Sequence, residues 1–297
     1  MRKSIVIGVD VGGTFTDILS LDEVLGEVHV EKVPSTKGDQ SSGFLSGIMA
    51  ATNRDLSSVS TIIHGTTVAT NALLERKGAK AGIITTEGFR DVLEMRRRDR
   101  PTTWGLWGQF TPVIERKCRL EVPERTLADG TVVKEIDPAS IEAAAKDLIE
   151  QGCESVCLFF INGYANKNNE TKAAKILRQV WPNDYVSVAT EILPEIREFE
   201  RCSTASLNAY LQPVVANYLA RLEDRIANEN SDSEILIVQS NGGIMSVDAA
   251  KAFPVRTALS GPAAGVVAAR QIANAAGFLN VITCDMGGTS FDVSLVA

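Results

Sequence analysis

The sequence predicts an α/β protein organised around two glycine-rich hairpins. Apolar strand patterns alternate with helical patterns through much of the chain, which is typical of α/β layering. In addition, the stretch D-V-G-G-T-F-T-D at Asp10–Asp17 returns as D-M-G-G-T-S-F-D at Asp285–Asp292. Five of the eight positions agree, and the two starts lie 275 residues apart (285 minus 10). Such a match indicates that the two stretches share a role.

Each copy lies between two apolar strand patterns. Ser4–Val9 precedes the first copy and Ile18–Leu21 follows it, while Val281–Cys284 and Val293–Val296 enclose the second. Both copies are therefore predicted to be tight strand-loop-strand hairpins. Paired glycines leave no Cβ in the way, so successive backbone N–H groups can turn toward one anion and form a nest.

The aspartates that open the two copies are candidates for metal binding and catalysis. A carboxylate at a strand end repels phosphate, but it can hold Mg²⁺ or a water that the metal carries. Asp10 and Asp285 are the residues predicted for this role, and the hydroxyls of Thr14 and Thr289 could add donors to the nests. The simpler alternative is a pair of ordinary hairpins with turn-favouring aspartates.

Composition limits the classes of function. The 297 residues are enough for about two domains, and 44% hydrophobic with 23% charged residues is typical of a soluble globular protein. A net charge of -7 argues against broad nucleic-acid binding, which needs a basic surface. No apolar run reaches membrane-spanning length. We therefore expect a cytoplasmic protein with no nucleic-acid or membrane partner.

His64 is the third candidate catalytic residue. It ends a short strand pattern that starts at Thr61, Gly65 makes a turn, and Thr66 or Thr67 can cap the following helix. A helix start just beyond a strand end is a natural site for an anion or a substrate. The alternative is a buried, hydrogen-bonded histidine. The run Arg96–Arg100 is either a solvated helix end or a site for a substrate carboxylate.

Periodicity predicts the remaining elements. The predicted strands are 27–33, 81–85, 155–161, 186–189 and 234–239, with a hairpin of 118–122 and 131–135. The predicted helices are 40–52, 89–98, 138–150, 170–180, 199–228 with a kink or break at Pro213, and 263–276.

Six stretches give the chain a strong family resemblance. The two D-x-G-G-T hairpins resemble the phosphate loops of the actin-like ATPase superfamily. Within it, the chain resembles the ATP-dependent hydantoinase A and 5-oxoprolinase family. The stretches that carry this resemblance are Gly8–Asp17, H-G-T-T-V-A-T-N-A-L-L-E-R-K-G at His64–Gly78, P-E-I-R-E-F-E-R-C-S-T at Pro194–Thr204, S-N-G-G at Ser240–Gly243, S-G-P-A-A-G at Ser260–Gly265, and Asp285–Asp292. Phe291 departs from the family pattern, where threonine is frequent.

The resemblance implies a ribonuclease H-like first domain with an inserted α/β region and a second domain that is only begun. Residues 1–200 are expected to form the N-terminal domain with the first phosphate hairpin. Residues 201–297 are expected to hold a helical connection and the start of the second ATPase domain. Family members are considerably longer, so we expect an N-terminal portion that lacks the adenine pocket and has little ATP turnover of its own.

The resemblance also implies a function. It predicts that ATP and Mg²⁺ are used to phosphorylate and open a cyclic amide such as a hydantoin or 5-oxoproline, with a B-type hydantoinase subunit or domain as partner and a homo-oligomer left open. An ATPase subunit of a ketone carboxylase is the alternative, and a nucleotide-responsive binding module like a chaperone ATPase is a third reading. The residues expected to bind the nucleotide phosphates are Gly12, Gly13, Thr14, Thr16 and Asp17 in the first hairpin and Gly287, Gly288 and Thr289 in the second.

Overall fold

The computed structural model describes residues 4–36, 40–52, 55–97, 110–286 and 291–297. Its contacts divide the chain into two compact units, which are described separately. Unit 1 combines Met1–Glu75 with Val214–Ala297, and unit 2 is Arg76–Pro213. The expected segments 1–200 and 201–297 follow the order of the sequence, whereas unit 1 joins both ends of the chain.

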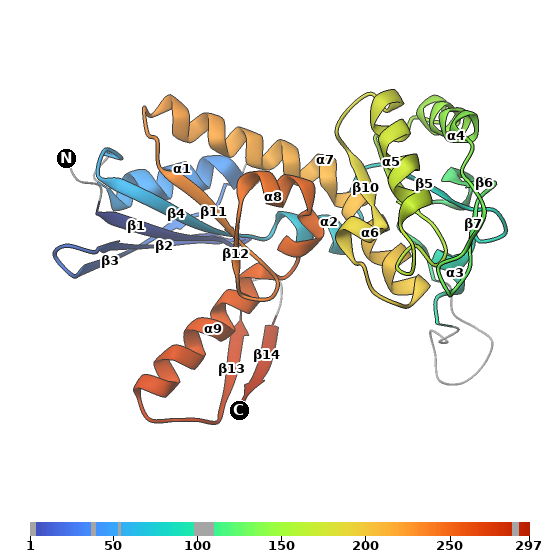
Figure 1. Ribbon diagram of the computed structural model, residues 1–297. Helices are drawn as coiled ribbons and strands as arrows, with labels where there is room; N and C mark the ends of the chain where they lie inside the picture. The colour runs from blue at the N-terminus through green and yellow to red at the C-terminus, as the bar shows by residue number, and fades with distance from the viewer. Residues whose placement is uncertain (1–3, 37–39, 53–54, 98–109, 287–290) are drawn as a thin grey trace. The chain divides into compact units, whose positions relative to one another are not determined.

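Unit 1 is built on a six-stranded sheet with the order β12-β11-β4-β1-β2-β3 (Figure 1). Its strands are β1 (Ile5–Val11), β2 (Phe15–Asp22), β3 (Glu27–Pro34), β4 (Val59–Thr66), β11 (Glu234–Val238) and β12 (Ile244–Ser246). The strands β1, β2 and β3 form an antiparallel meander, and β4 and β11 continue the sheet in parallel with β1.

One face of this sheet forms the core of unit 1. Ile7, Val9 and Val11 alternate along β1 and are buried on this face. Helix α1 (Gln40–Ala51) packs on β1, β2 and β3, and the second half of α7 (Glu198–Asn228) contributes further buried residues (Figure 1). Because side chains alternate, Asp10 projects from the opposite face.

The remaining elements of unit 1 lie outside this six-stranded sheet. They are α2 (Val68–Leu74), α8 (Val247–Ala252), the 3-10 turn η2 (Pro254–Thr257), α9 (Ser260–Ala275), β13 (Val281–Met286) and β14 (Phe291–Val296). The strands β13 and β14 form a separate antiparallel pair in which Asp285 lies opposite Asp292, and α9 contacts both strands. The strands on either side of the second glycine loop are therefore confirmed.

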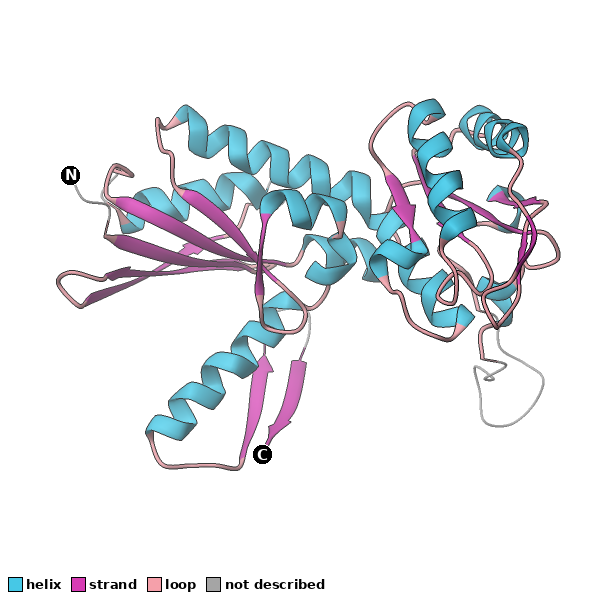
Figure 2. Cartoon of the chain, in the orientation of Figure 1, coloured by secondary structure: helices cyan, strands magenta, loops and turns pink. Residues whose placement is uncertain are grey.

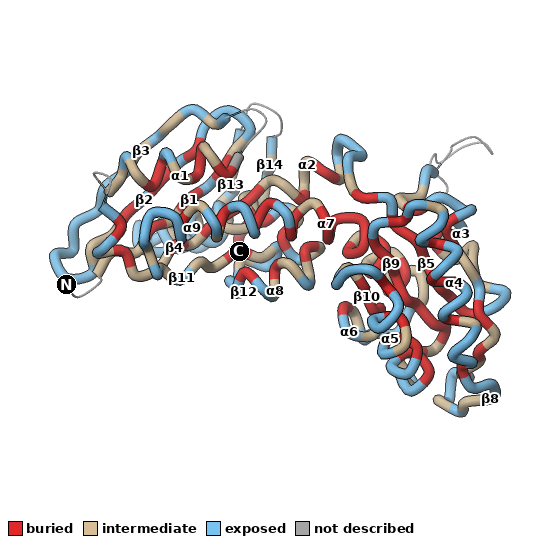
Figure 3. The backbone as a smooth tube through the Cα atoms, turned by 90° about the horizontal axis from the view of Figure 1, so that it is seen from above, coloured by how far each residue is buried: buried red, intermediate tan, exposed pale blue. Residues whose placement is uncertain are grey.

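Unit 2 is a second α/β layer structure, built on a parallel sheet with the order β10-β9-β5-β6 (Figure 2). Its elements are β5 (Ala81–Thr86), α3 (Val92–Met95), η1 (Arg116–Cys118), β6 (Arg119–Val122), β7 (Arg125–Thr126), β8 (Val132–Lys134), α4 (Pro138–Glu150), β9 (Ser155–Phe159), α5 (Asn168–Val180), β10 (Val186–Val188) and α6 (Ala189–Ile192). Both β5 and β9 are buried along their whole length (Figure 3). Continuous apolar strands are typical of parallel sheets covered on both faces.

Two sequence predictions in unit 2 are wrong. The predicted hairpin of 118–122 with 131–135 does not form, because β6 pairs in parallel with β5, while β8 pairs with the two-residue strand β7. The predicted helix 89–98 reduces to the four residues of α3 among the described positions, since Arg96 takes a positive φ of 53°, which is not helical, and ends it.

The long predicted helix is confirmed as α7, a single helix of 31 residues with Pro213 inside it, so the proline does not split it in two. The division between the two units falls directly after this proline. No helix in the described part of the chain is both long enough and apolar enough to cross a bilayer.

All five cysteines are free thiols, as their odd number and scattered positions predict. Cys118, Cys153, Cys157 and Cys202 are buried, and Cys284 in β13 is exposed. Burial raises the pKa of Cys202 to about 12, so this thiol stays protonated and unreactive near neutral pH.

Candidate functional site

Asp10 lies near the carboxyl end of β1, where several of the sequence motifs meet. In the sheet it is paired with Asp17 on β2 and with Gly65 on β4. These three residues share the face of the sheet opposite α1, because paired residues of neighbouring strands project to the same side. The Asp10 carboxylate is accessible to solvent.

The charges around Asp10 come from both hairpins. Partial desolvation raises the pKa of Asp10, and the negative charges of Asp17 and Asp285 raise it further. Asp285 is exposed and belongs to β13, so the two D-x-G-G-T segments lie close enough to act on each other electrostatically. Asp17 is paired with Lys32 at 2.8 Å. A site of this kind favours a cation that can offset the repulsion between its carboxylates.

The first glycine loop is held in place by Ser35, which sequence reasoning did not single out. The Ser35 hydroxyl donates to the Gly12 carbonyl at 2.8 Å, and its backbone N–H donates to the Thr14 carbonyl at 2.9 Å. The Thr16 hydroxyl lies 3.0 Å from that of Ser35 and is buried. This placement favours a supporting role for Thr16 behind the loop, whereas Gly13, Thr14 and Asp17 are exposed in front of it.

The H-G-T-T motif joins β1 to α2. The Thr67 hydroxyl donates to the Val11 carbonyl at 3.1 Å, and the Thr66 hydroxyl accepts from the Val68 N–H at 3.2 Å. Together these contacts fix the end of β1, and therefore the backbone next to Asp10, against the β4–α2 turn.

The S-G-P and S-N-G-G motifs meet the same edge of the sheet. The Ser260 hydroxyl donates to the Thr66 carbonyl at 3.2 Å, so the start of α9 is bound to the end of β4. In the S-N-G-G turn, the Ser240 hydroxyl donates to the Arg256 carbonyl at 2.8 Å, just before α9. Four of the family stretches therefore gather at the carboxyl edge of the unit 1 sheet.

His64 points away from this edge, into the core of unit 1. Its side chain is fully buried, with the Phe44 ring 4.8 Å away in an edge contact. Its Nδ1 lies 3.3 Å from the Val9 carbonyl, which can only accept, so the neutral ring donates there and accepts from the Tyr218 hydroxyl at 2.8 Å. This geometry favours a structural role for His64 over the predicted catalytic one.

The burial of His64 predicts a pH-dependent stability. Desolvation lowers the pKa of His64 from 6.5 to about 4, because the charged ring is disfavoured in the core. The unfolded chain therefore takes up a proton before the folded chain does, and the stability present above pH 6.5 is lost as the pH falls through about 4. The loss should reach about 3 kcal/mol, and His64→Gln should remove this pH dependence, as measured by urea unfolding at several pH values.

The exposed His29 provides the control, because these are the only two histidines in the chain. His29→Gln should leave the pH dependence unchanged. A dependence that survives in His64→Gln and disappears in His29→Gln would contradict the assignment.

Part of the predicted site lies outside the described residues. Gly287, Gly288 and Thr289 belong to the segment 287–290, and Arg98 and Arg100 fall in 98–109. Within unit 2, Arg97 is paired with Glu200, and the Arg96 guanidinium lies 4.6 Å from the centre of the Phe110 ring. A substrate-binding role for this arginine run stays a prediction.

The carboxylates fit the Mg²⁺ that the resemblance implies. No three His, Cys, Asp or Glu side chains converge closely enough to hold a metal alone, as far as the described residues go. Mg²⁺ usually keeps several waters and is bound through one or two carboxylates together with phosphate oxygens. The accessible Asp10 carboxylate, with Asp285 close enough to raise its pKa, supplies donors of this kind.

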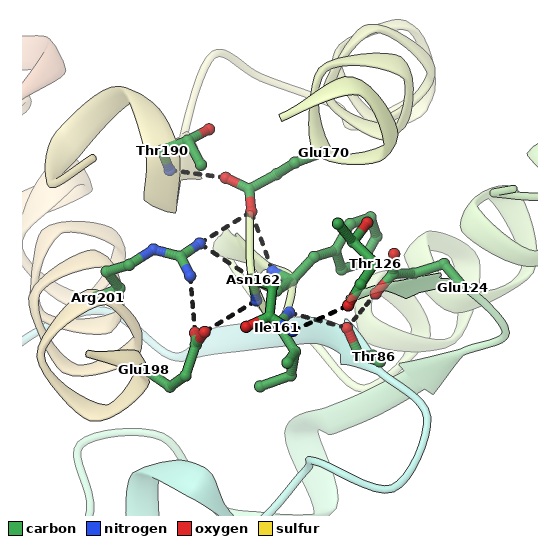
Figure 4. Close-up of polar contacts among 10 residues, drawn as sticks. Thr86, Glu124, Thr126, Ile161, Asn162, Glu170, Thr190, Glu198 and Arg201 are labelled. Atoms are coloured by element: carbon green, nitrogen blue, oxygen red, sulfur yellow. Dashed lines mark hydrogen bonds and ion pairs between the residues drawn. The ribbon is translucent and has the colours of Figure 1, made fainter. Parts of the chain in front are cut away.

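The stretch P-E-I-R-E-F-E-R-C-S-T at Pro194–Thr204 contributes to a buried polar network of unit 2 (Figure 4). The Arg201 guanidinium is fully buried and pairs with Glu198 at 2.7 Å and with Glu170 at 3.4 Å. Glu170 also accepts from the backbone N–H groups of Thr190 and Phe160, at 2.7 and 3.0 Å. These contacts join α7 to α5, to α6 and to the end of β9. The buried charges therefore have a structural role.

Comparison with known proteins agrees with this geometry. Family models described as hydantoinase/oxoprolinase N-terminal region and hydantoinase/oxoprolinase match residues 6–181 and 201–297. Caprolactamase subunit alpha of Pseudomonas jessenii is 34% identical over 97% of this chain and 43% of its own length. Acetophenone carboxylase gamma subunit of Aromatoleum aromaticum is 32% identical over 98% of this chain and 42% of its own length.

Two solved structures share the fold. The ATP-dependent caprolactamase of Pseudomonas jessenii aligns with a TM-score of 0.86 and 34% identity, covering 98% of this chain and 43% of that one. Nucleotide-free acetone carboxylase, described as catalysing ATP-dependent acetone carboxylation, aligns with a TM-score of 0.86 and 26% identity, covering 100% of this chain and 44% of that one. The chain thus spans less than half of the length of these relatives.

The sheet order, the paired hairpins and these neighbours place the chain in the actin-like ATPase class of folds. Within that class, it belongs to the hydantoinase/oxoprolinase family.

Proposed function

We propose that this chain carries the phosphate-binding hairpins of an ATP-dependent enzyme that phosphorylates and opens a cyclic amide such as a hydantoin or 5-oxoproline. The observation that carries the proposal is the position of Asp10. Its carboxylate lies at a strand end beside a glycine loop, and Asp285 of the matching hairpin is close enough to raise its pKa. Family membership and an ATP-dependent caprolactamase among the relatives support the same reaction class.

The chemistry follows from the weakness of an amide as an electrophile. Transfer of the γ-phosphoryl group to the amide oxygen forms a P–O bond, breaks the bond between the γ-phosphorus and the bridging oxygen of ATP, and releases ADP. Water then adds to the ring carbon, and the ring C–N bond breaks as the amine leaves with a proton. Hydrolysis of the resulting acyl phosphate by a second water gives the carboxylate and releases phosphate. Mg²⁺ would supply charge neutralisation on the phosphate oxygens. In this chain, Asp10 and Asp285 would orient the hydrated cation. The backbone N–H groups of Gly12 and Gly13, and those of Gly287 and Gly288, would stabilise negative charge on the transferred group.

A ketone carboxylase ATPase subunit is the second candidate function. The likeness to the acetophenone carboxylase gamma subunit and to acetone carboxylase favours it. In that reaction ATP would activate a carbonyl compound or bicarbonate in place of an amide, and the same hairpins would hold the phosphates.

The two functions are separated by an ATP-hydrolysis screen of the full-length protein with its neighbouring subunit. We expect phosphate release that depends on Mg²⁺ and rises at least about tenfold with a hydantoin, 5-oxoproline or another lactam. Stimulation by a ketone together with bicarbonate would select the carboxylase. Turnover that responds to a protein partner and ignores both substrate classes would favour the chaperone-like module.

Partner and location are proposed on the same basis. Several relatives are subunits by name, including a caprolactamase alpha subunit and carboxylase beta and gamma subunits. We propose a B-type hydantoinase subunit or domain as the partner and the cytoplasm as the location. Co-purification of the full-length protein with the product of the neighbouring gene tests the first of these.

A further inference from the structure

Two glycines from distant parts of the chain lie against the Asp10 carboxylate. A Cβ built on Gly65, in β4, would lie 3.2 Å from Oδ1 of Asp10. A Cβ built on Gly261, in the first turn of α9, would lie 3.4 Å from the same oxygen. A side chain at Gly65 would therefore press on the carboxylate that the proposed function uses, and one at Gly261 would come into van der Waals contact with it.

Backbone conformation does not explain these glycines. Neither has a positive φ, so an alanine could adopt the same backbone at both positions. Glycine within a strand or helix costs roughly 0.5–1 kcal/mol relative to alanine. Gly265, one turn further along α9, has nothing within 4 Å of its built Cβ. Space for the Asp10 side chain is therefore what distinguishes Gly65 and Gly261.

The two glycines are also held at a fixed separation. The Ser260 hydroxyl donates to the Thr66 carbonyl at 3.2 Å, and the Leu259 N–H donates to the Thr70 hydroxyl at 2.9 Å. Leu259 has a left-handed φ of 60°, which is uncommon for a bulky residue and requires support from its surroundings. These contacts bind the start of α9 to β4 and α2. A side chain added at Gly65 would therefore shift the Asp10 carboxylate rather than helix α9.

We propose that Gly65 and Gly261 are positioning residues that hold the Asp10 carboxylate in one orientation toward the Mg²⁺ and phosphates of bound ATP. The inference rests on the proposed function and extends it to two residues that have no side chain of their own. A contact of 3.2 Å obliges the carboxylate to move by a few tenths of an ångström in Gly65→Ala. Reactions of this kind are sensitive to such displacements, since a 1 Å misplacement can cost about a hundredfold in rate.

The test compares Gly65→Ala, Gly261→Ala and Gly265→Ala in the full-length protein. Each exchange adds one methyl group, and the last two lie in the same helix. Gly65→Ala should lower kcat about tenfold, raise the half-saturating Mg²⁺ concentration severalfold, and leave KM for the ring substrate unchanged. Gly261→Ala should have a smaller effect in the same direction, and Gly265→Ala none.

A second readout does not depend on turnover. Binding of Mn²⁺ in the presence of ADP, followed by electron paramagnetic resonance, should weaken severalfold in Gly65→Ala, while the thermal unfolding temperature stays close to that of the unmodified protein. Wild-type Mn²⁺ affinity and kcat in Gly65→Ala would overturn the proposal, as would equal losses in Gly65→Ala and Gly265→Ala. If Gly65→Ala does not fold, Gly261→Ala against Gly265→Ala decides the question.

Failure of the proposed function would look different. Weakened Mn²⁺ binding in Gly65→Ala, without any turnover stimulated by a ring amide, would count against the cyclic-amide reaction and in favour of the positioning role. Ring-stimulated turnover in a Gly65→Ala protein with normal kcat and normal Mn²⁺ affinity would count against the positioning role alone.

Discussion

Asp10→Ala in the full-length protein is expected to lower ATP turnover by at least about a hundredfold. The variant loses the carboxylate that we propose for orienting Mg²⁺, and water would have to replace it. Asp285→Ala should have a comparable effect. Phosphate release measured under saturating ATP and Mg²⁺ gives the rates, and normal turnover in either variant would refute the proposed mechanism.

Asp10→Ala should lower ATP turnover without lowering the free energy of unfolding. The pKa of Asp10 is raised by desolvation and by the charges of Asp17 and Asp285, so its ionised form is disfavoured in the folded chain. Removing that charge is expected to leave the unfolding free energy unchanged or to increase it. Asp55→Asn is a matched control, because Asp55 precedes β4 at the opposite edge of the sheet and accepts from the Ser57 N–H at 2.8 Å. Asp55→Asn should change neither ATP turnover nor the free energy of unfolding.

Arg201→Met is expected to destabilise unit 2 by about 3–5 kcal/mol. The substitution leaves the fully buried Glu170 without the guanidinium that offsets its charge. Burial raises the pKa of Glu170, and Arg201 is the main influence that opposes this rise. The exchange also removes the donor to the Phe160 carbonyl at 3.1 Å. Urea unfolding of the chain, followed by a probe in unit 2, measures the loss.

A double variant separates the ion pair from simple loss of packing. In Arg201→Met with Glu170→Gln, the uncompensated charge is gone, so part of the lost stability should return. Arg178→Met is the matched surface control, since Arg178 and Glu191 form an exposed pair that should contribute less than about 1 kcal/mol. Equal losses in Arg201→Met and Arg178→Met would show that burial of the network does not matter.

The hairpins could be predicted from sequence because their determinants are local. The repeat of Asp, Gly, Gly, Thr and Asp between apolar strands specifies both the turn and the direction of the carboxylate. The order of the elements through unit 1 followed from periodicity in the same way. The predicted pairing of 118–122 with 131–135 was wrong because the true partner of 119–122 is distant in sequence. Strand β6 joins the sheet beside β5.

Which neighbour in a motif faces the site could not be predicted. His64 and Gly65 are adjacent in β4, so they face opposite sides of the sheet. The His64 side chain enters the core, and Gly65 lies next to Asp10 on the other face. The choice between the two faces depends on Phe44 in α1 and Tyr218 in α7, which are distant in sequence. The sequence therefore pointed to His64, which has the more reactive side chain. It gave no sign that Gly65 and Gly261 lie against the Asp10 carboxylate.

Cys284 offers a natural attachment point for a spectroscopic reporter. It is the one exposed thiol among the five cysteines, and it directly precedes Asp285 in β13. The other four are buried, so within residues 1–297 a maleimide dye should react at this position. A fluorophore there would sit one residue from the second hairpin's carboxylate, and its emission could report nucleotide arrival in real time before any substrate has been identified.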